Sequence, residues 1–263
     1  MALSASFEAI DQVEDQMSLY RPDSQLVRLN QLGFLNRPHP DLVRVLRYAQ
    51  QLSARSAGAF DVTVQPLWQH RDQEHAVTLV DWRQLDIGEA RIAFRRPGMQ
   101  ATLNGIAQGF AADRVASALQ AHGIAHALVD TGEVASFGKR ESQVAWKVGL
   151  QHPRREDAFV GLVGLSDRCL ATSGDYATTF TEDFSQHHLI DPRTGRSPAE
   201  LSSVTVAATS AMEADALSTA AFVLGLEKGM ALIEQMNGTD AMMIRKADGQ
   251  SFASAGFPTL QQS

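Results

Sequence analysis

Two short polar clusters in the last third of this chain carry side chains suited to catalysis. His188 precedes an apolar pair that ends in the turn 191–195, and Asp215 precedes Thr219 by four positions. Residues four apart on an α-helix lie on one face, so this carboxylate and this hydroxyl can point the same way. Oxygen ligands suit Mg²⁺ or Ca²⁺ better than Zn²⁺, which prefers histidine or cysteine. Together the clusters indicate a base beside a site for a hard cation.

The helix that this interpretation requires is supported locally over residues 211–224. Ser210 and Glu213 match a capping box, alanine, leucine and methionine fill the interior, and Gly225 supplies a stop. We expect the Asp215 carboxylate to face the surface. The alternative from spacing alone is a solvated aspartate beside a threonine that bonds back to its own helix.

Composition limits the classes of protein to which the chain can belong. It has 263 residues, of which 44% are hydrophobic and 20% charged, as in soluble globular proteins of one large or two small domains. The net charge of -7 argues against general nucleic-acid binding. No apolar run reaches the length of about 18 residues that predicts a membrane span. The single cysteine, Cys169, excludes an internal disulfide and is expected to be a buried thiol.

Hydrophobic periodicity divides the chain into helices and short strands. Helices grouped with hairpin-like strands favour an α+β fold over a regular βαβ alternation. The helix expected after Gly105 leaves free backbone N–H groups that can seat an anion. Helices are predicted at 7–17, 41–54, 106–121 and 211–224, and strands at 127–129, 134–137, 145–150, 159–165, 202–208 and 241–244.

Six blocks of sequence follow one another in a recognisable order between about residues 10 and 245. They are DSQLVRLN (23–30), GAFDVT (58–63), NGIAQGF (104–110), ATSGDY (171–176), HLIDPRTG (188–195) and DALST (215–219). Taken together, these blocks resemble the ApbE-type flavin transferases, which are FAD:protein FMN transferases. Motifs for hydride transfer, zinc proteolysis and serine hydrolysis are absent.

The resemblance implies both a fold and a reaction. The implied fold is ApbE-like and T-fold-like α+β, with mixed antiparallel sheets packed against helices. One domain would cover 1–263, with two subdomains around the FAD site as the alternative division. The implied reaction transfers FMN from FAD to a threonine hydroxyl of a target flavoprotein, releases AMP and uses Mg²⁺. By position, the Gly105 carbonyl, Asp215 and Thr219 would bind the metal, and His188 would be the general base.

The resemblance also implies a set of residues around FAD. A tyrosine and a phenylalanine can cover flat rings, and a Thr-Ser-Gly turn can meet polar edges or phosphate. The chain departs from relatives at three of these positions, because most carry Asp at 102 and Lys at 108, and many carry Asp at 218. No counterpart of the usual opening strand precedes Phe7. The implied residues are Tyr20, Ala59, Phe60, Asp61, Thr102, Gln108, Thr172, Ser173, Gly174, Asp175, Tyr176, Ile190 and Ser218.

Two other functions remain open at this point. The same site can hydrolyse FAD to FMN and AMP if water replaces the threonine, or it can bind flavin without turnover. The resemblance implies an acceptor with a threonine motif, expected to be an electron-transfer subunit, and favours the periplasm or cell envelope. A cytoplasmic location is expected instead if this N-terminus is native, because it shows no export signal.

Overall fold

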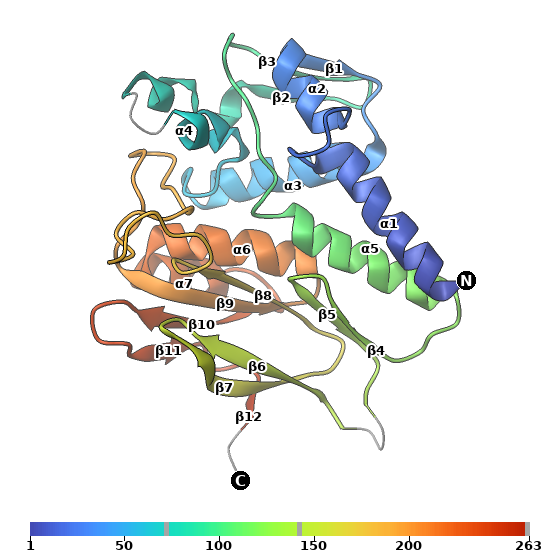
Figure 1. Ribbon diagram of the computed structural model, residues 1–263, viewed down its shortest axis with the longest axis vertical. Coiled ribbons are helices and arrows are strands. Elements are labelled where there is room, and N and C mark those ends of the chain that lie inside the picture. Colours follow the sequence, from blue (N-terminus) through green and yellow to red (C-terminus); the bar gives the residue numbers. More distant parts are fainter. Residues whose placement is uncertain (71–73, 141–143, 261–263) are drawn as a thin grey trace.

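A six-stranded antiparallel sheet lies at the centre of the computed structural model, which describes residues 1–70, 74–140 and 144–260 (Figure 1). Its strand order is β11-β10-β9-β8-β5-β4. All eight residues of β9 are buried, because the sheet is covered on both faces. The strands are β4 (Ala127–Asp130), β5 (Val134–Phe137), β8 (Cys169–Gly174), β9 (Leu201–Ala208), β10 (Asp240–Arg245) and β11 (Ser251–Ala253).

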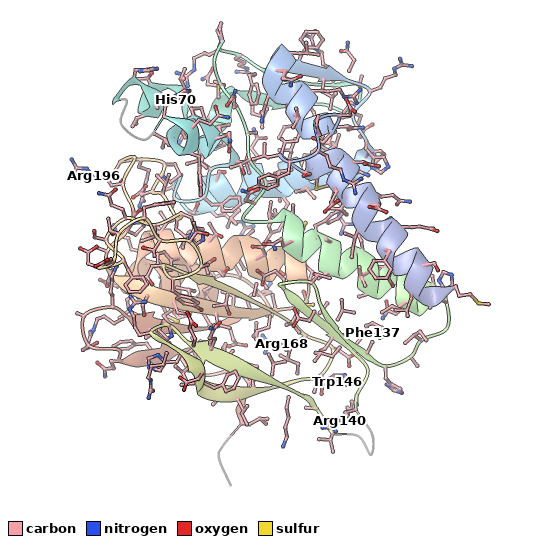
Figure 2. All side chains as sticks on the ribbon, in the orientation of Figure 1. His70, Phe137, Arg140, Trp146, Arg168 and Arg196 are labelled. Atoms are coloured by element: carbon pink, nitrogen blue, oxygen red, sulfur yellow. The ribbon has the colours of Figure 1, made fainter. Side chains whose placement is uncertain are left out.

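Helices α5 (Ala107–Ala121), α6 (Ala211–Leu224) and α7 (Leu226–Glu234) cover one face of this sheet. The other face packs on a three-stranded sheet of β6 (Trp146–His152), β7 (Arg155–Leu165) and β12 (Thr259–Leu260). Figure 2 shows Trp146 and Arg140 on this lower side, away from α6. Most of α6 is buried, which suits a helix rich in small apolar residues on every face.

The remaining elements lie above α5 and α6 in Figure 1. A small antiparallel sheet has the strand order β1-β3-β2 and lies beside α2. Among the described residues, no helix has both the length and the apolar character needed to cross a bilayer. The elements are α1 (Ala2–Met17), α2 (Gln25–Leu32), β1 (Phe34–Asn36), α3 (Pro40–Arg55), α4 (Gln65–Gln69), β2 (Leu85–Ile87) and β3 (Arg91–Phe94), with short 3₁₀ turns at Val62–Val64, Glu74–Leu79 and Trp82–Gln84.

The α+β fold predicted from sequence is confirmed, and α6 begins and ends where its cap and glycine predicted. Three differences are informative. The Thr-Ser-Gly stretch expected as a turn is the end of β8, because it pairs with β9 from Thr172 to Gly174. Helices α2 and α7 were not predicted, nor was the small upper sheet. Cys169 is buried as expected.

Candidate functional site

Helices α5 and α6 meet closely at their N-terminal turns. A Cβ atom on Gly109 would lie 2.2 Å from the Ala211 carbonyl oxygen, so only glycine permits this approach. Asp113 of α5 accepts hydrogen bonds from the backbone N–H groups of Ala211 (2.8 Å) and Met212 (3.0 Å). A carboxylate there both caps α6 and complements its dipole. The two helices are therefore fixed relative to one another.

The predicted metal ligands lie along this contact, which we call the α5–α6 seam (residues 105–109 and 215–219). The Gly109 N–H donates to Oδ2 of Asp215 at 3.0 Å. One turn away, a Cβ atom on Gly105 would lie 2.9 Å from Oγ1 of Thr219, so the Gly105 backbone lies directly beside that hydroxyl. The structure therefore brings Gly105, Asp215 and Thr219 together along one seam.

The expectation that Asp215 faces the surface is wrong, because its side chain is only 4% exposed. Burial raises the pKa of the Asp215 carboxyl, and only the Gly109 N–H opposes this shift. Within the described ranges, no lysine or arginine forms an ion pair with Asp215. A buried carboxylate without a counter-charge is costly, and a bound cation would remove that cost.

Glu133 is a second acidic group at the seam, and it was given no role by the sequence. It follows Gly132 in the turn between β4 and β5. Burial and the negative charge of Asp215 raise the pKa of Glu133, whereas the Thr172 N–H lowers it. A Cβ atom on Gly132 would lie 3.1 Å from Nε2 of Gln108, so the Gln108 amide lies beside this turn. The only sequence signal that could have indicated that Glu133 lies near Asp215 is its place directly after a glycine in a turn.

The donor set at the seam fits a hard cation. It consists of a carboxylate, a hydroxyl and a backbone carbonyl, which are the oxygen types that Mg²⁺ binds in proteins. No group of three histidine, cysteine, aspartate or glutamate side chains that suits a metal occurs among residues 1–70, 74–140 and 144–260. The fit therefore depends on the Thr219 hydroxyl and the Gly105 carbonyl as well as on Asp215 and, at longer range, Glu133.

Three hydroxyl groups form a chain next to these ligands. Ser173 Oγ, at the end of β8, lies 2.7 Å from Ser218 Oγ and 3.2 Å from Thr219 Oγ1. Ser218 Oγ donates to the backbone carbonyl of Asp215 at 2.9 Å. Ser173 and Ser218 are both buried, so neither hydroxyl is well placed to reach a large ligand directly.

The two adjacent histidines differ in burial. His187 is buried with its ring edge-on to Phe222 at 5.5 Å and its Nε2 3.0 Å from the Pro198 carbonyl oxygen. Burial lowers the pKa of His187. His188 is half-buried, its N–H donates to the Thr178 carbonyl at 2.9 Å, and its Nδ1 lies 3.2 Å from the same oxygen. His187 thus anchors the segment, and His188 is the accessible imidazole.

Asp175 anchors the other end of the segment 175–200 that carries His188. Its carboxylate is fully buried and accepts two hydrogen bonds of 2.7 Å from Arg154, with Lys246 Nζ at 3.1 Å. Lys246 also donates to the Phe184 carbonyl at 2.5 Å, and the Arg154 guanidinium lies 4.0 Å from the Phe184 ring centroid. These four residues, which we call the Asp175 latch, tie the segment to the sheets. A direct contact between Asp175 and FAD stays a prediction.

Several other predicted FAD contacts have structural partners of their own. Asp61 is buried and accepts from the N–H groups of Thr63 (2.8 Å) and Trp82 (3.0 Å). The Thr102 hydroxyl accepts from the Asn104 N–H at 3.2 Å. The remaining predicted contacts are as follows: Thr172 bonds Thr205, Tyr176 covers Gly174, Ala59 and Phe60 are buried, Ile190 is half-buried, and Tyr20 is 85% exposed.

Two hollows lie on the surface, and one of them includes a predicted site residue. A cavity of about 250 Å³ is lined by Gly58 and Asp61 on one side and by Pro192 and Arg193 on the other. Of its lining residues, Asp61 was predicted to contact FAD, and Pro192 and Arg193 belong to the block 188–195 that includes the predicted contact Ile190. A larger groove of about 620 Å³ lies beside α3, and none of its lining residues is a predicted site residue. In Figure 2, His70 and Arg196 lie on the same edge of the molecule.

The fold and its buried, oxygen-rich seam define an α+β protein with a site suited to a hard cation. A model of the ApbE family matches residues 2–243. The chain belongs to the ApbE family. It is 33% identical to an FAD:protein FMN transferase of Vibrio cholerae over 94% of this chain and 81% of that protein. It is also 33% identical to an FAD:protein FMN transferase of Treponema pallidum, over 97% of this chain and 80% of that protein.

Solved structures give the same result. The flavin transferase ApbE from Vibrio cholerae matches with a TM-score of 0.86 and 30% identity, over 98% of this chain and 90% of that chain. The apo form of the Pseudomonas stutzeri flavinyl transferase ApbE matches with a TM-score of 0.82 and 32% identity, over 96% of this chain and 84% of that chain. The predicted family and the ApbE-like fold are therefore confirmed.

Proposed function

We propose that this chain transfers FMN from FAD to a threonine hydroxyl of a partner flavoprotein. The threonine oxygen would attack the phosphorus on the FMN side of the pyrophosphate, the P–O bond to AMP would break, and AMP would leave. The observation that carries the proposal is the buried, unpaired Asp215 carboxylate beside Thr219 and Gly105. Membership of the ApbE family and the names of the relatives support the same reaction.

Asp215, Thr219 and the Gly105 carbonyl are the groups that would hold Mg²⁺. When bound, the cation would polarise the pyrophosphate and offset the negative charge that develops during displacement. Burial raises the pKa of the Asp215 carboxyl, and a bound cation would oppose this shift because it stabilises the ionised form. At the start of α5 the Gly109 N–H already donates to the Asp215 carboxylate and the Ala107 N–H to the Leu103 carbonyl, so the anion seat expected there stays a prediction.

His188 is the group that would accept the proton of the threonine hydroxyl. A carbonyl oxygen can only accept, so the contact between Nδ1 and the Thr178 carbonyl favours a proton on Nδ1. Nε2 is then the basic nitrogen. Imidazole is the usual general base of enzymes that work near neutral pH.

The acceptor that we propose is an electron-transfer flavoprotein at the cell envelope or in the periplasm. This part rests on the sequence resemblance, and the FAD:protein FMN transferase relatives support a flavoprotein target only in general terms. Labelling of envelope and soluble fractions from the same cells would test the location.

The test is a transfer assay with FAD, Mg²⁺ and an acceptor protein that carries the threonine motif. We expect a fluorescent acceptor band in a denaturing gel and AMP in equal amount by chromatography. The band should be lost with EDTA and with His188→Ala, and retained with His122→Ala, which removes an exposed histidine just after α5. AMP without a labelled acceptor would indicate FAD hydrolysis instead. Neither product with bound flavin would indicate a binding protein.

A further inference from the structure

The hydroxyl chain Thr219–Ser173–Ser218 has a fixed direction. Each hydroxyl has one proton to donate, whereas a backbone carbonyl can only accept. Ser218 Oγ lies 2.9 Å from the Asp215 carbonyl oxygen, so its proton is used there. Ser173, which lies 2.7 Å from Ser218 Oγ, must then donate to Ser218. With its own proton used, Ser173 can only accept from Thr219 across the 3.2 Å contact.

This direction determines how Thr219 presents its oxygen. We infer that Ser173 and Ser218 are positioning residues that hold the Thr219 proton on the Ser173 side, so that the lone pairs of Oγ1 face the seam. The inference deepens the proposed metal role of Thr219 and rests on it. A hydroxyl that ligates a cation must offer a lone pair, because a proton directed at the cation would be repelled.

The position of Gly105 agrees with this arrangement. Its backbone lies next to Thr219 Oγ1, with a hypothetical Cβ at 2.9 Å, while Ser173 contacts the same oxygen through its hydroxyl. The hydroxyl is therefore held between a hydrogen-bond acceptor and the backbone that carries the proposed carbonyl ligand. Burial of Ser173 and Ser218 keeps water from competing for these protons.

Ser218 provides the most specific test, because it makes no direct hydrogen bond to Thr219 and acts on it only through Ser173. In Ser218→Ala, the Ser173 proton loses its acceptor and can turn towards Thr219, where it would occupy the lone pair. Partners that orient a metal ligand typically change metal affinity by about 10- to 100-fold when removed. We expect an effect at the low end of that range.

The experiment is a titration of the metal-free protein with Mn²⁺, followed by the electron paramagnetic resonance signal of the free ion. We expect Ser218→Ala and Ser173→Ala to raise the Mn²⁺ dissociation constant by about tenfold. Ser173→Thr keeps a hydroxyl on strand β8 and should stay within about threefold of wild type. Ser202→Ala is the matched control, since it removes a buried serine hydroxyl that bonds the Ile244 carbonyl outside the chain of hydroxyls.

Thermal unfolding of the same variants separates positioning from stability. A purely structural role predicts that Ser218→Ala and Ser202→Ala lower Tm similarly and leave Mn²⁺ affinity unchanged. That result, with Thr219→Ala still weakening Mn²⁺ binding, would overturn the inference and leave the metal role of Thr219 intact. If the wild-type protein binds no Mn²⁺, the metal role in the proposed function fails and the inference fails with it. Flavin transfer is not needed for either conclusion.

Discussion

The α5–α6 seam and the segment 175–200 are built by different kinds of contact, although both carry groups proposed for one reaction. At the seam, two regular helices approach at glycine positions, and Asp215 is buried in the resulting contact. The segment has almost no regular structure and is held by the contact of the His187 ring with Phe222 at one place and by the Asp175 latch at another. The groups on the seam are fixed by the packing of two helices, whereas the segment that carries His188 is attached to the rest of the fold chiefly by side chains.

The two kinds of contact suit two different tasks, cation binding at the seam and proton transfer at His188. A cation site needs several oxygens held at fixed distances, and packed helices supply that rigidity. A general base must reach an incoming protein hydroxyl, so a segment at the surface with a few strong attachments is suitable. Changes at the seam should therefore affect cation binding, and changes at the latch should affect transfer while cation binding persists.

The largest expected effect follows from replacing the buried carboxylate. Asp215→Asn should lower Mg²⁺-dependent transfer by more than about 100-fold, since a direct ligand matters more than its supporting groups. Stability without metal should be equal to or greater than that of wild type, because an unpaired buried carboxylate is costly. Transfer rates and thermal unfolding of the same sample measure both. Asp248→Asn, on an exposed pair with Arg245, is the control and should change neither.

An Asp215→Asn variant that is active, or that unfolds without metal, would contradict this view of the seam. An active variant would show that Asp215 is not a metal ligand. The second would show that the carboxylate is needed for packing through the Gly109 N–H.

The next effect concerns the latch. Arg154→Gln removes the two 2.7 Å hydrogen bonds to Asp175 and should destabilise the segment by about 2 kcal/mol. A fully buried pair would cost more, but the Arg154 side chain is partly exposed. Displacement of His188 by about 1 Å can lower the transfer rate by about 100-fold. Mn²⁺ affinity should stay at the wild-type value. Arg155→Gln, the exposed neighbour, is the control for charge.

Limited proteolysis would show whether the segment 175–200 has loosened in Arg154→Gln. Equal loss of Mn²⁺ binding and transfer in this variant would mean that the two regions are not independent. The comparison between seam and segment would then be wrong.

A third prediction tests how the seam is assembled. Gly109→Ala places a Cβ atom 2.2 Å from a backbone oxygen of α6, so the helices must separate. Overpacking of this kind costs about 1–3 kcal/mol. Gly161→Ala, on β7, meets no atom within 4 Å and should be neutral within about 0.5 kcal/mol. Denaturant unfolding of both variants measures the difference, and equal effects would contradict a close helix contact.

The parts of the site that depend on neighbours in sequence could be predicted, whereas those that depend on tertiary contacts could not. The Ser210 cap, the alanine- and leucine-rich interior and the stop at Gly225 predicted α6 with its correct ends. The i, i+4 spacing correctly predicted that Asp215 and Thr219 share one face of that helix. The burial of Asp215 was missed because it results from the approach of Gly109 on another helix. Glu133 was missed because the β4–β5 turn meets the seam only in the folded chain.

The same distinction explains the error at residues 171–176. Thr-Ser-Gly is a common turn composition, but here pairing with β9 makes it a strand end. The ion pairs of Asp175 with Arg154 and Lys246 were also missed, because these partners follow β6 and β10, whereas its contact with FAD stays a prediction. Local propensity cannot predict partners so distant in sequence.

The smallest expected effect is a dependence of stability on pH that reports directly on the seam. The pKa of Asp215 is raised in the folded protein above its ordinary value of 3.8, chiefly by burial. Such a group stabilises the fold when it is protonated, and this contribution is lost as pH rises through the raised pKa. Without metal, Tm should therefore fall as pH is raised from about 5 to 8, by about 2–5 °C for a chain of this size.

Mg²⁺ should oppose this fall in Tm because it binds the ionised carboxylate. In Asp215→Asn, Tm should change less with pH, with or without Mg²⁺. Part of the slope should remain in that variant, because burial also raises the pKa of Glu133. A Tm that rises with pH in the metal-free wild type would show that the seam carboxylates are stabilised in their charged form by a group other than a cation.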